Sequence, residues 1–257
     1  MWHGCVSIIE QQALPCDCFR MVLAAPEVVV LAKPGQFVHV RCSDDYDPLL
    51  RRPISINRLD KAAGQLTILY KVLGRGTAQL ARLRAGQQLD IMGPLGNGFT
   101  IQGEKPLLIG GGLGTAPLLA LADAFAPGTP TMIMGAQNEG GLIRQQEFED
   151  CCCALHIATN DGSAGYCGHA PVLAEALFTG QHFDMIYACG PEPMLRYVQK
   201  MAEKFAIPCQ ISLEEFMACG VGACLGCTCK AADSSKPYQK VCTDGPVFWS
   251  GEVCLDD

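Results

Sequence analysis

The 257-residue sequence has no long hydrophobic run and little positive charge, and each absence excludes a class of protein. No apolar stretch approaches the length that a membrane-spanning helix needs, and residues 1–4 lack the basic start of a signal peptide. The chain has 19 Lys and Arg against 26 Asp and Glu, so its net charge of −7 argues against nucleic acid and anionic membranes as partners. We therefore expect a cytoplasmic protein that binds neither nucleic acid nor membrane.

The sequence also lacks the side-chain patterns of common metal and hydrolytic sites. None of the five histidines has metal-ligand spacing, and no Ser/His/Asp arrangement has the context of a nucleophile. Cysteine, in contrast, is abundant, with sixteen residues. This number would indicate disulfides in a small secreted chain, but reduced thiols and one metal cluster fit a cytoplasmic protein better. We interpret the run at 151–153 (Cys151, Cys152 and Cys153), which has no ligand spacing, as buried or incidental thiols.

The most informative stretch is CGVGACLGCTC, residues 219–229, which VCTDGP follows at 241–246. Its cysteines have the C-x4-C-x2-C spacing of a plant-type 2Fe–2S cluster, and a fourth thiolate lies further on. The interleaved glycines let the backbone pass close to the cluster sulfides. The predicted ligands are Cys219, Cys224, Cys227 and Cys242. A structural zinc site and plain redox or structural thiols are the alternatives, and Cys229 offers an alternative last ligand that we do not favour.

The first hundred residues predict a small antiparallel β-barrel. Short apolar stretches alternate with glycine and proline turns, such as those at 33–35 and 84–86. We expect strands at residues 28–31, 36–40, 64–70 and 89–92.

One strand of this barrel carries residues 50–56, in which Arg52 precedes Ser55 by three positions. A guanidinium binds diphosphate oxygens bidentately, and a serine hydroxyl can lie beside it. An exposed arginine before a β-strand is the alternative interpretation.

Two further stretches strengthen the diphosphate interpretation. Residues 69–71 end a strand, and the Gly-Arg-Gly-Thr of 74–77 opens a predicted helix at 77–84, whose N-terminus favours an anion. A glycine-rich turn at 92–99 closes the barrel. This order resembles the flavin domain of the ferredoxin–NADP reductase superfamily and implies FAD. The FAD contacts that the resemblance implies are Arg52, Pro53, Ile54, Ser55, Leu69, Tyr70, Lys71, Gly76 and Thr77.

The middle of the chain predicts a doubly wound α/β domain. A strand at 105–109 runs into GGGLGTAP and then an apolar helix at 118–125, the context of a phosphate-binding loop. A tight glycine turn in any α/β protein is the alternative, but the superfamily writes its nicotinamide loop in this form. The loop residues are Gly110, Gly111, Gly112, Gly114, Thr115, Ala116 and Pro117. Further strands are expected at 131–135, 154–159 and 185–188, with helices at 171–179 and 193–205.

The last of these strands ends in a C-G-P-x-x-M signature, which in the superfamily meets the nicotinamide at the flavin. The resemblance makes Cys189 the candidate catalytic residue and Gly190 and Pro191 cofactor contacts, whereas a buried cysteine at a strand end is the alternative. Residues 135–140 contain no arginine and one acid, which favours NAD, although Arg144 leaves NADP open.

Over essentially its whole length the chain resembles the electron-transfer subunits of NAD-dependent dihydroorotate dehydrogenase. The motifs that carry this are L-E-E-x-M-A-C-G-x-G-A-C-x-x-C and V-C-x-D-G-P-V-F, with Phe216 where a basic residue is common. The resemblance implies a role in pyrimidine biosynthesis. Electrons from dihydroorotate would pass from FMN in a separate catalytic subunit through the cluster and FAD to NAD+, in an assembly of two copies of each subunit.

The expected architecture has three parts: an FAD-binding antiparallel β-barrel (1–102), a doubly wound α/β nicotinamide domain (103–209) and a small 2Fe–2S module (210–257). Two rival functions stay open. One is the small subunit of a glutamate synthase-like or ferredoxin:NADP oxidoreductase, which shares this order of parts. The other is a non-enzymatic cluster or zinc scaffold whose flavin motifs are vestigial.

Overall fold

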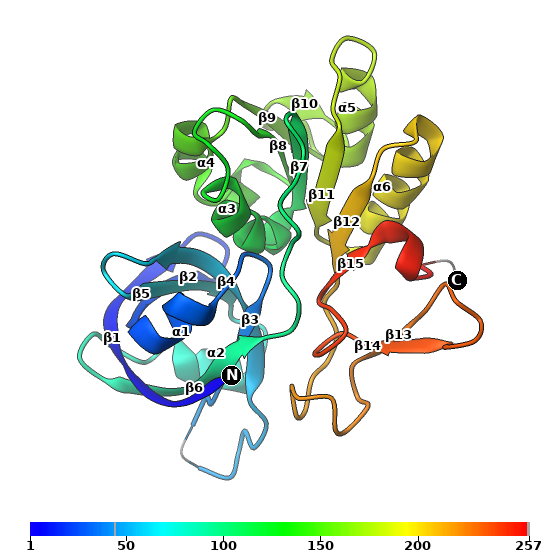
Figure 1. Cartoon of the computed structure of the whole chain (residues 1–257). Coiled ribbons are helices and arrows are strands. Elements are labelled where there is room, and N and C mark those ends of the chain that lie inside the picture. Colours follow the sequence, from blue (N-terminus) through cyan, green and yellow to red (C-terminus); the bar gives the residue numbers. More distant parts are fainter. Residues whose placement is uncertain (44, 256–257) are drawn as a thin grey trace.

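The computed structural model describes residues 1–43 and 45–255 and has the three predicted parts (Figure 1). A closed barrel formed by the N-terminal residues lies below an α/β layer structure, and the C-terminal segment lies beside both. Within the described residues, no helix has the length and apolar character to cross a membrane.

Six antiparallel strands close the barrel in the order β1-β2-β5-β4-β3-β6. They are β1 (Trp2–Leu14), β2 (Cys18–Ala24), β3 (Phe37–Val40), β4 (Arg52–Asp60), β5 (Gln65–Lys71) and β6 (Gln88–Leu95). Side chains alternate between the two faces of a strand, and Val38, Val40 and Ile54 fill the barrel core. Their neighbours on β3 and β4 therefore face the rest of the molecule: Phe37, His39, Pro53 and Ser55.

The predicted strand at 28–31 is wrong, because these residues lie in helix α1 (Pro26–Leu31). Pro26 fits the first helical turn, and Glu27 lies there too. Val28 and Val29 are buried against the barrel while Val30 is 74% exposed, a grouping that suits a helix and not an alternating strand. A second helix, α2 (Arg75–Leu80), begins two residues before the predicted start and ends before the predicted end.

The α/β domain has a seven-stranded sheet of order β10-β9-β8-β7-β11-β12-β15. Its strands are β7 (Pro106–Gly111), β8 (Thr131–Ala136), β9 (Ala154–Thr159), β10 (Tyr166–Cys167), β11 (Met185–Cys189), β12 (Cys209–Ser212) and β15 (Val247–Trp249). Helices α3 (Ala116–Ala122) and α4 (Gln145–Cys151) cover one face, and α5 (Ala170–Leu177) and α6 (Glu192–Phe205) cover the other. Short 3-10 turns are η1 (Gly112–Thr115), η2 (Glu139–Gly141) and η3 (Ser250–Glu252).

The C-terminal module is continuous with this sheet. The expected boundary at 209/210 falls inside β12, and β15 from the module pairs antiparallel with β12. A small hairpin of β13 (Thr228–Lys230) and β14 (Tyr238–Lys240) projects beyond it. The module also rests on the barrel, because the Asn97 main-chain N–H donates to the Gly245 carbonyl at 2.6 Å and its side-chain amide donates to the Asp244 carbonyl at 2.8 Å.

Candidate functional site

The cluster loop, residues 219–229, turns its main-chain amides toward its own thiols. Three residues of the loop have left-handed backbone, Gly220, Gly222 and Leu225, so the chain wraps tightly instead of forming a helix. The hydrogen bonds to sulfur, at 3.2–3.4 Å, run from Val221 and Cys224 to Cys219, from Gly222 to Cys242, from Gly226 to Cys224 and from Cys242 to Cys227. Each of the four predicted ligands therefore accepts at least one main-chain N–H at its sulfur.

The four thiols form two interacting pairs, Cys219 with Cys224 and Cys227 with Cys242. Burial opposes ionisation of Cys219, but the amides of Val221 and Cys224 outweigh it and lower its pKa to about 6. Burial and the adjacent Cys227 raise the pKa of Cys242 to about 11. Two pairs suit a cluster whose two irons each take two protein thiolates. Among the described residues no three His, Cys, Asp or Glu side chains surround a single point as one metal ion requires.

Cys229 does not share this setting. It lies on β13 opposite Gln239 and lines a pocket beside Lys230. Burial and the charge of Glu215 raise its pKa to about 11. Our preference for Cys242 over Cys229 stays a prediction, now supported by these surroundings.

Two of the predicted diphosphate residues, Arg52 and Gly76, come together at the start of β4, whereas Ser55 lies on the opposite face of that strand. The Arg52 guanidinium lies against Gly76, where an added Cβ would be 3.1 Å from Arg52 Nε. Arg52 Nη1 donates to the Leu50 carbonyl at 2.6 Å, which fixes the guanidinium in this place. The Thr77 hydroxyl accepts from the Leu73 amide at 2.9 Å and orders the turn before α2. This arrangement fits a diphosphate.

The other predicted FAD contacts divide by the face of the strand on which they lie. Pro53 and Ser55 point out of the barrel, whereas the Ile54 and Tyr70 side chains are buried inside it. Burial raises the pKa of Tyr70, whose hydroxyl donates to Gln11 Oε1 at 3.3 Å. Leu69 packs between the barrel and α3. Side-chain contact with a flavin is therefore available to Pro53 and Ser55, and main-chain contact alone to the buried residues.

Lys71 faces a different cavity. It lines a cleft of about 600 Å³ together with residues of the β1–β2 turn, opposite the glycine loop. Other residues that line the cleft include Gly111, Gly112, Leu113, Gly135, Ala136, Gln137, Asn138, Asn160, His169 and Tyr197. Lys71 is the one Lys or Arg, and no Asp or Glu is present, among the described residues that line it. The cleft therefore favours an anionic ligand.

The glycine loop and the C-G-P signature meet in the structure. A Cβ on Gly114 would lie 2.5 Å from the Cys189 carbonyl oxygen, so glycine is required where η1 approaches the end of β11. The Thr115 hydroxyl donates to the Gly112 carbonyl at 2.9 Å and fixes the loop. Ala116 and Pro117 are buried at the start of α3. Their side chains shape the loop and do not line the cleft.

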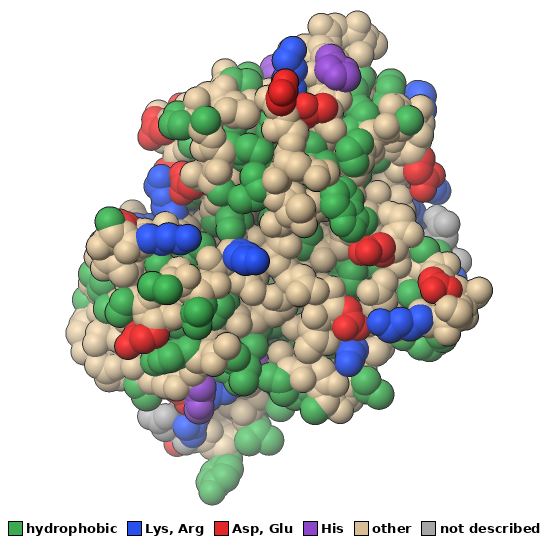
Figure 2. All heavy atoms as spheres, in the orientation of Figure 1, with side chains coloured by type: hydrophobic (Ala, Val, Ile, Leu, Met, Phe, Trp, Pro, Cys, Tyr) green, Lys and Arg blue, Asp and Glu red, His purple; other side chains and the backbone are tan. Residues whose placement is uncertain are grey.

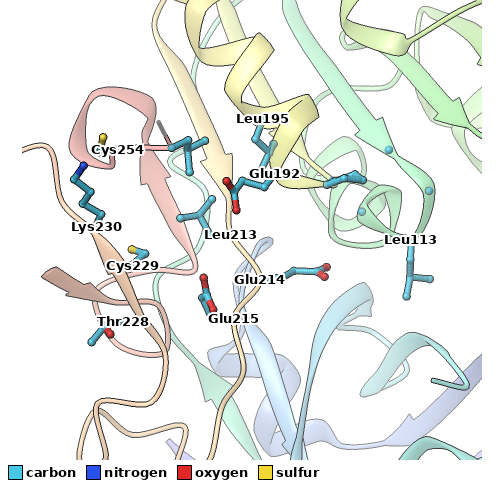
Figure 3. A pocket seen from close by; sticks show the side chains of 16 residues that line it. Leu113, Glu192, Leu195, Leu213, Glu214, Glu215, Thr228, Cys229, Lys230 and Cys254 are labelled. Atoms are coloured by element: carbon cyan, nitrogen blue, oxygen red, sulfur yellow. The ribbon is translucent and has the colours of Figure 1, made fainter. Parts of the chain in front are cut away.

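A second pocket of about 570 Å³ continues from this loop beneath the cluster module (Figure 3). Glu214 enters it on the side of Leu113, and its carboxylate is open to the pocket although protein surrounds it closely. Loss of water in this setting raises the pKa of Glu214. Burial, with the Glu214 charge, also raises the pKa of Cys189, which is 1% exposed. Sequence reasoning missed Glu214, although an acid two residues after the buried strand β12 was a signal.

Arg144 links the α/β domain to the barrel. Its guanidinium donates to Asn57 Oδ1 at 2.5 Å and to Glu147 Oε1 at 2.7 Å, and 8% of its side chain is exposed. Asn57 in turn donates to the Ala116 carbonyl at 2.8 Å. Arg144 does not line the cleft. Arg144, the residue that kept NADP as an alternative, therefore binds Asn57 and Glu147 in place of a 2′-phosphate.

Both ends of the chain match known domain families. Residues 7–99 match the oxidoreductase FAD-binding domain, and residues 214–254 match the iron-sulfur cluster binding domain of dihydroorotate dehydrogenase B. These matches confirm the predicted FAD and iron–sulfur parts.

The whole chain is similar to proteins named dihydroorotate dehydrogenase B (NAD(+)), electron transfer subunit. One from Bacillus caldolyticus is 42% identical, with 97% of this chain and 98% of the relative aligned. One from Desulforamulus reducens is 40% identical over 92% of each. A solved NADH-dependent reduced ferredoxin-NADP oxidoreductase superposes with a TM-score of 0.85 at 29% identity, covering 98% of this chain and 90% of its own. The ferredoxin reductase in carbazole 1,9a-dioxygenase, with TM-score 0.66, 23% identity and coverage of 80% and 67%, shares the fold.

Proposed function

The chain belongs to the family of dihydroorotate dehydrogenase B (NAD(+)) electron transfer subunits, and from this premise we propose its specific role. It carries electrons from a partner subunit, which oxidises dihydroorotate to orotate with FMN, to NAD+. FAD and a 2Fe–2S cluster are its own cofactors and NAD is its substrate. The observation that carries the proposal is the cluster loop with its paired thiols, which lies against the FAD barrel. We place this reaction in pyrimidine biosynthesis in the cytoplasm.

The residues of the barrel hold FAD. When bound, FAD accepts or delivers a pair of electrons as hydride and exchanges them singly with the cluster. Arg52, locked by Gly76 and the Leu50 carbonyl, binds the diphosphate. Pro53 and Ser55, which face outward from β4, lie beside the flavin ring. The thiols of the four cluster ligands hold the irons, and the loop amides offset the negative charge on sulfur.

The dinucleotide lies in the cleft between the barrel and the sheet. The glycine loop admits the pyrophosphate close to the backbone because no Cβ atoms obstruct it. Lys71 lines the same cleft and supplies its positive charge, which supports a role with NAD in place of the predicted contact with FAD. Glu214 lines the second pocket, which shares Gly111, Gly112, Leu113 and Pro191 with the cleft, and from there it orients the nicotinamide. Cys189 is 1% exposed and lines neither cavity, so it supports the end of β11 behind the glycine loop.

The partner subunit docks over the cluster loop. Phe216 is 93% exposed, Leu225 61% and Val221 43%, so apolar side chains surround a loop that must approach an electron donor. On the barrel side Tyr46 and Leu49 are also largely exposed. Charged side chains are scattered singly or in small groups over the face in Figure 2, so an apolar contact and not a charged one fits this partner. We propose two copies of each subunit in the assembly.

An anaerobic visible and EPR spectrum of the purified chain, before and after NADH, tests the role. Flavin bands together with a rhombic two-iron signal that grows on reduction support it. Absence of both the flavin and the cluster signals would contradict the electron-transfer proposal.

The second candidate function is the small subunit of a ferredoxin:NADP oxidoreductase-like enzyme, favoured by the structural likeness at 29% identity. Co-purification with an FMN subunit that reduces NAD+ with dihydroorotate supports our proposal. A preference for NADPH and a partner without dihydroorotate activity would support the second candidate.

A further inference from the structure

One buried histidine lies at the contact between the barrel and the cluster loop. His39 is on β3 with its side chain outside the barrel, and it is 0% exposed. Its strand partners are Pro53 on β4 and Met92 on β6. A Cβ on Gly220 would lie 2.6 Å from His39 Nδ1 and 3.2 Å from Cε1. The imidazole therefore separates the strand that bears the flavin motif from the first turn of the cluster loop.

Both ring nitrogens of His39 lack a hydrogen-bond partner among the described residues. The main chains of Arg51 and Cys219 lie nearby, but neither meets hydrogen-bond geometry with a ring nitrogen. Native proteins rarely leave a buried side-chain polar atom without a hydrogen-bond partner. A group that is not part of the polypeptide therefore completes this site.

The chemistry of the neighbours decides which nitrogen donates. A neutral imidazole carries one N–H donor and one lone pair. Thiolate and sulfide sulfur in a cluster accept hydrogen bonds and donate none. Nδ1 is the ring nitrogen nearest Gly220, so the proton belongs there.

We propose that His39 is a positioning residue for the cluster, whose Nδ1–H donates a hydrogen bond to a cluster sulfur and raises the reduction potential of the cluster. The inference rests on the proposed function, because it requires the 2Fe–2S cluster in this loop. A donor to sulfur stabilises the reduced cluster, which carries more negative charge. The same contact holds the loop beside the flavin strand.

The test is an EPR-monitored redox titration of the FAD- and cluster-loaded chain with three variants of His39. His39→Leu removes the donor, His39→Asn keeps an N–H at the position of Nδ1, and His39→Gln moves it toward Nε2. We expect the ratio of reduced to oxidised cluster at a fixed potential to fall about tenfold in the Leu and Gln variants, the size of one hydrogen bond. The Asn variant should stay near wild type. The g-values should shift with the potential, while FAD and iron contents remain full.

His156→Leu is the matched control, because His156 Nε2 on β9 also lacks a partner but lies in the nicotinamide domain. It should leave potential and g-values unchanged. An unchanged potential in His39→Leu with full cluster content would overturn the inference, as would rescue by Gln and not Asn. The Asn and Gln pair decides the matter if the Leu variant does not fold. A wild-type chain without a cluster signal would overturn the proposed function and this inference together.

Discussion

The cluster loop and the dinucleotide cleft are built in contrasting ways. The loop takes its predicted ligands from one segment, 219–242, and the amides that face the thiols belong to the same segment. The cleft draws its walls from the barrel hairpin, the glycine loop, the end of β8 and the C-G-P signature, which lie far apart in the sequence. The cleft recognises its ligand through glycines, which lack side chains, and through the main-chain groups that they expose, more than through any reactive atom.

This difference teaches where a substitution acts. A thiolate is the strongest side-chain ligand that this loop offers to iron, so we expect loss of one ligand to destabilise the whole cluster. In the cleft each wall contributes a part of the binding free energy, so single changes reduce affinity by degrees. A single substitution should therefore abolish cluster binding by the loop, whereas in the cleft it should only weaken dinucleotide binding.

The largest effect is expected from Cys224→Ser. It removes one thiolate of the Cys219–Cys224 pair, and the two-iron EPR signal should disappear entirely. FAD should remain bound, because the diphosphate cradle at Arg52 and Gly76 is part of the barrel. The measurement is iron, flavin and EPR content of the same preparation. Equal loss of FAD would break the comparison, since the two parts would then depend on each other.

Cys229→Ser is the matched control in the same module. Cys229 lines the pocket beside Lys230 and accepts none of the loop amides that serve the ligands. The cluster signal should persist at wild-type intensity. Its disappearance would assign the last ligand to Cys229 and not Cys242.

The next largest effect is expected from Gly114→Ala in the cleft, on the KM for NADH. The new Cβ would lie 2.5 Å from the Cys189 carbonyl, and overpacking against main chain costs about 1–3 kcal/mol. The KM for NADH should rise about tenfold or more, with FAD and cluster signals intact. Gly180→Ala, at an exposed glycine with nothing within 4 Å, should change nothing. A normal KM in Gly114→Ala would show that the loop adapts.

The same contrast decides how much could be predicted from the sequence. Cluster ligands have fixed spacing and one residue type, so Cys219 and its partners could be predicted directly from the sequence. Four strands of the sheet, β7, β8, β9 and β11, were predicted within two residues of their ends from their apolar runs. The strands β10, β12 and β15 were not predicted. The predicted strand at residues 28–31 was wrong because four apolar residues in a row show neither the strand nor the helix period. Pro26, which fits the first turn of a helix, was the signal for α1.

Contacts between distant segments could not be predicted. Nothing in the sequence joins Lys71 to the glycine loop, His39 to Gly220 or Arg144 to Asn57, because each pair meets only after the domains pack. Ile54 and Tyr70 belong to a correct motif, yet the strand period turns their side chains into the barrel.

Lys71→Met sharpens the comparison with a graded effect. It keeps the apolar stem and removes the one Lys or Arg charge among the described residues of the cleft wall. The KM for NADH should rise about three- to tenfold with kcat unchanged, as for loss of a partly exposed charge pair of about 1 kcal/mol. Inhibition by ADP-ribose should weaken and inhibition by adenosine should not. Lys61→Met, at an exposed turn, is the control; loss of FAD from Lys71→Met would return Lys71 to the flavin site.

The smallest effect is expected from Glu214→Gln, where the two regions meet. Desolvation raises the pKa of Glu214 in the folded chain, so its charged form is disfavoured there. Below the ordinary pKa of glutamate both folded and unfolded chains hold the proton, and the group costs nothing. As pH rises from the ordinary pKa through the raised pKa, the unfolded chain releases its proton before the folded chain does. The free energy of unfolding therefore falls over this range.

The difference in Tm, variant minus wild type, should therefore increase from acid to neutral pH and then level off. Its size should be about 2 °C at most, because solvent in the open pocket screens the charge. Thermal unfolding of both proteins at a series of pH values measures it. Glu215→Gln, whose charge acts on Cys229 and not on Cys189, is the matched control. A pH-independent difference would mean that Glu214 is hydrated like a surface acid, and the junction of cleft and cluster module would then be open to water.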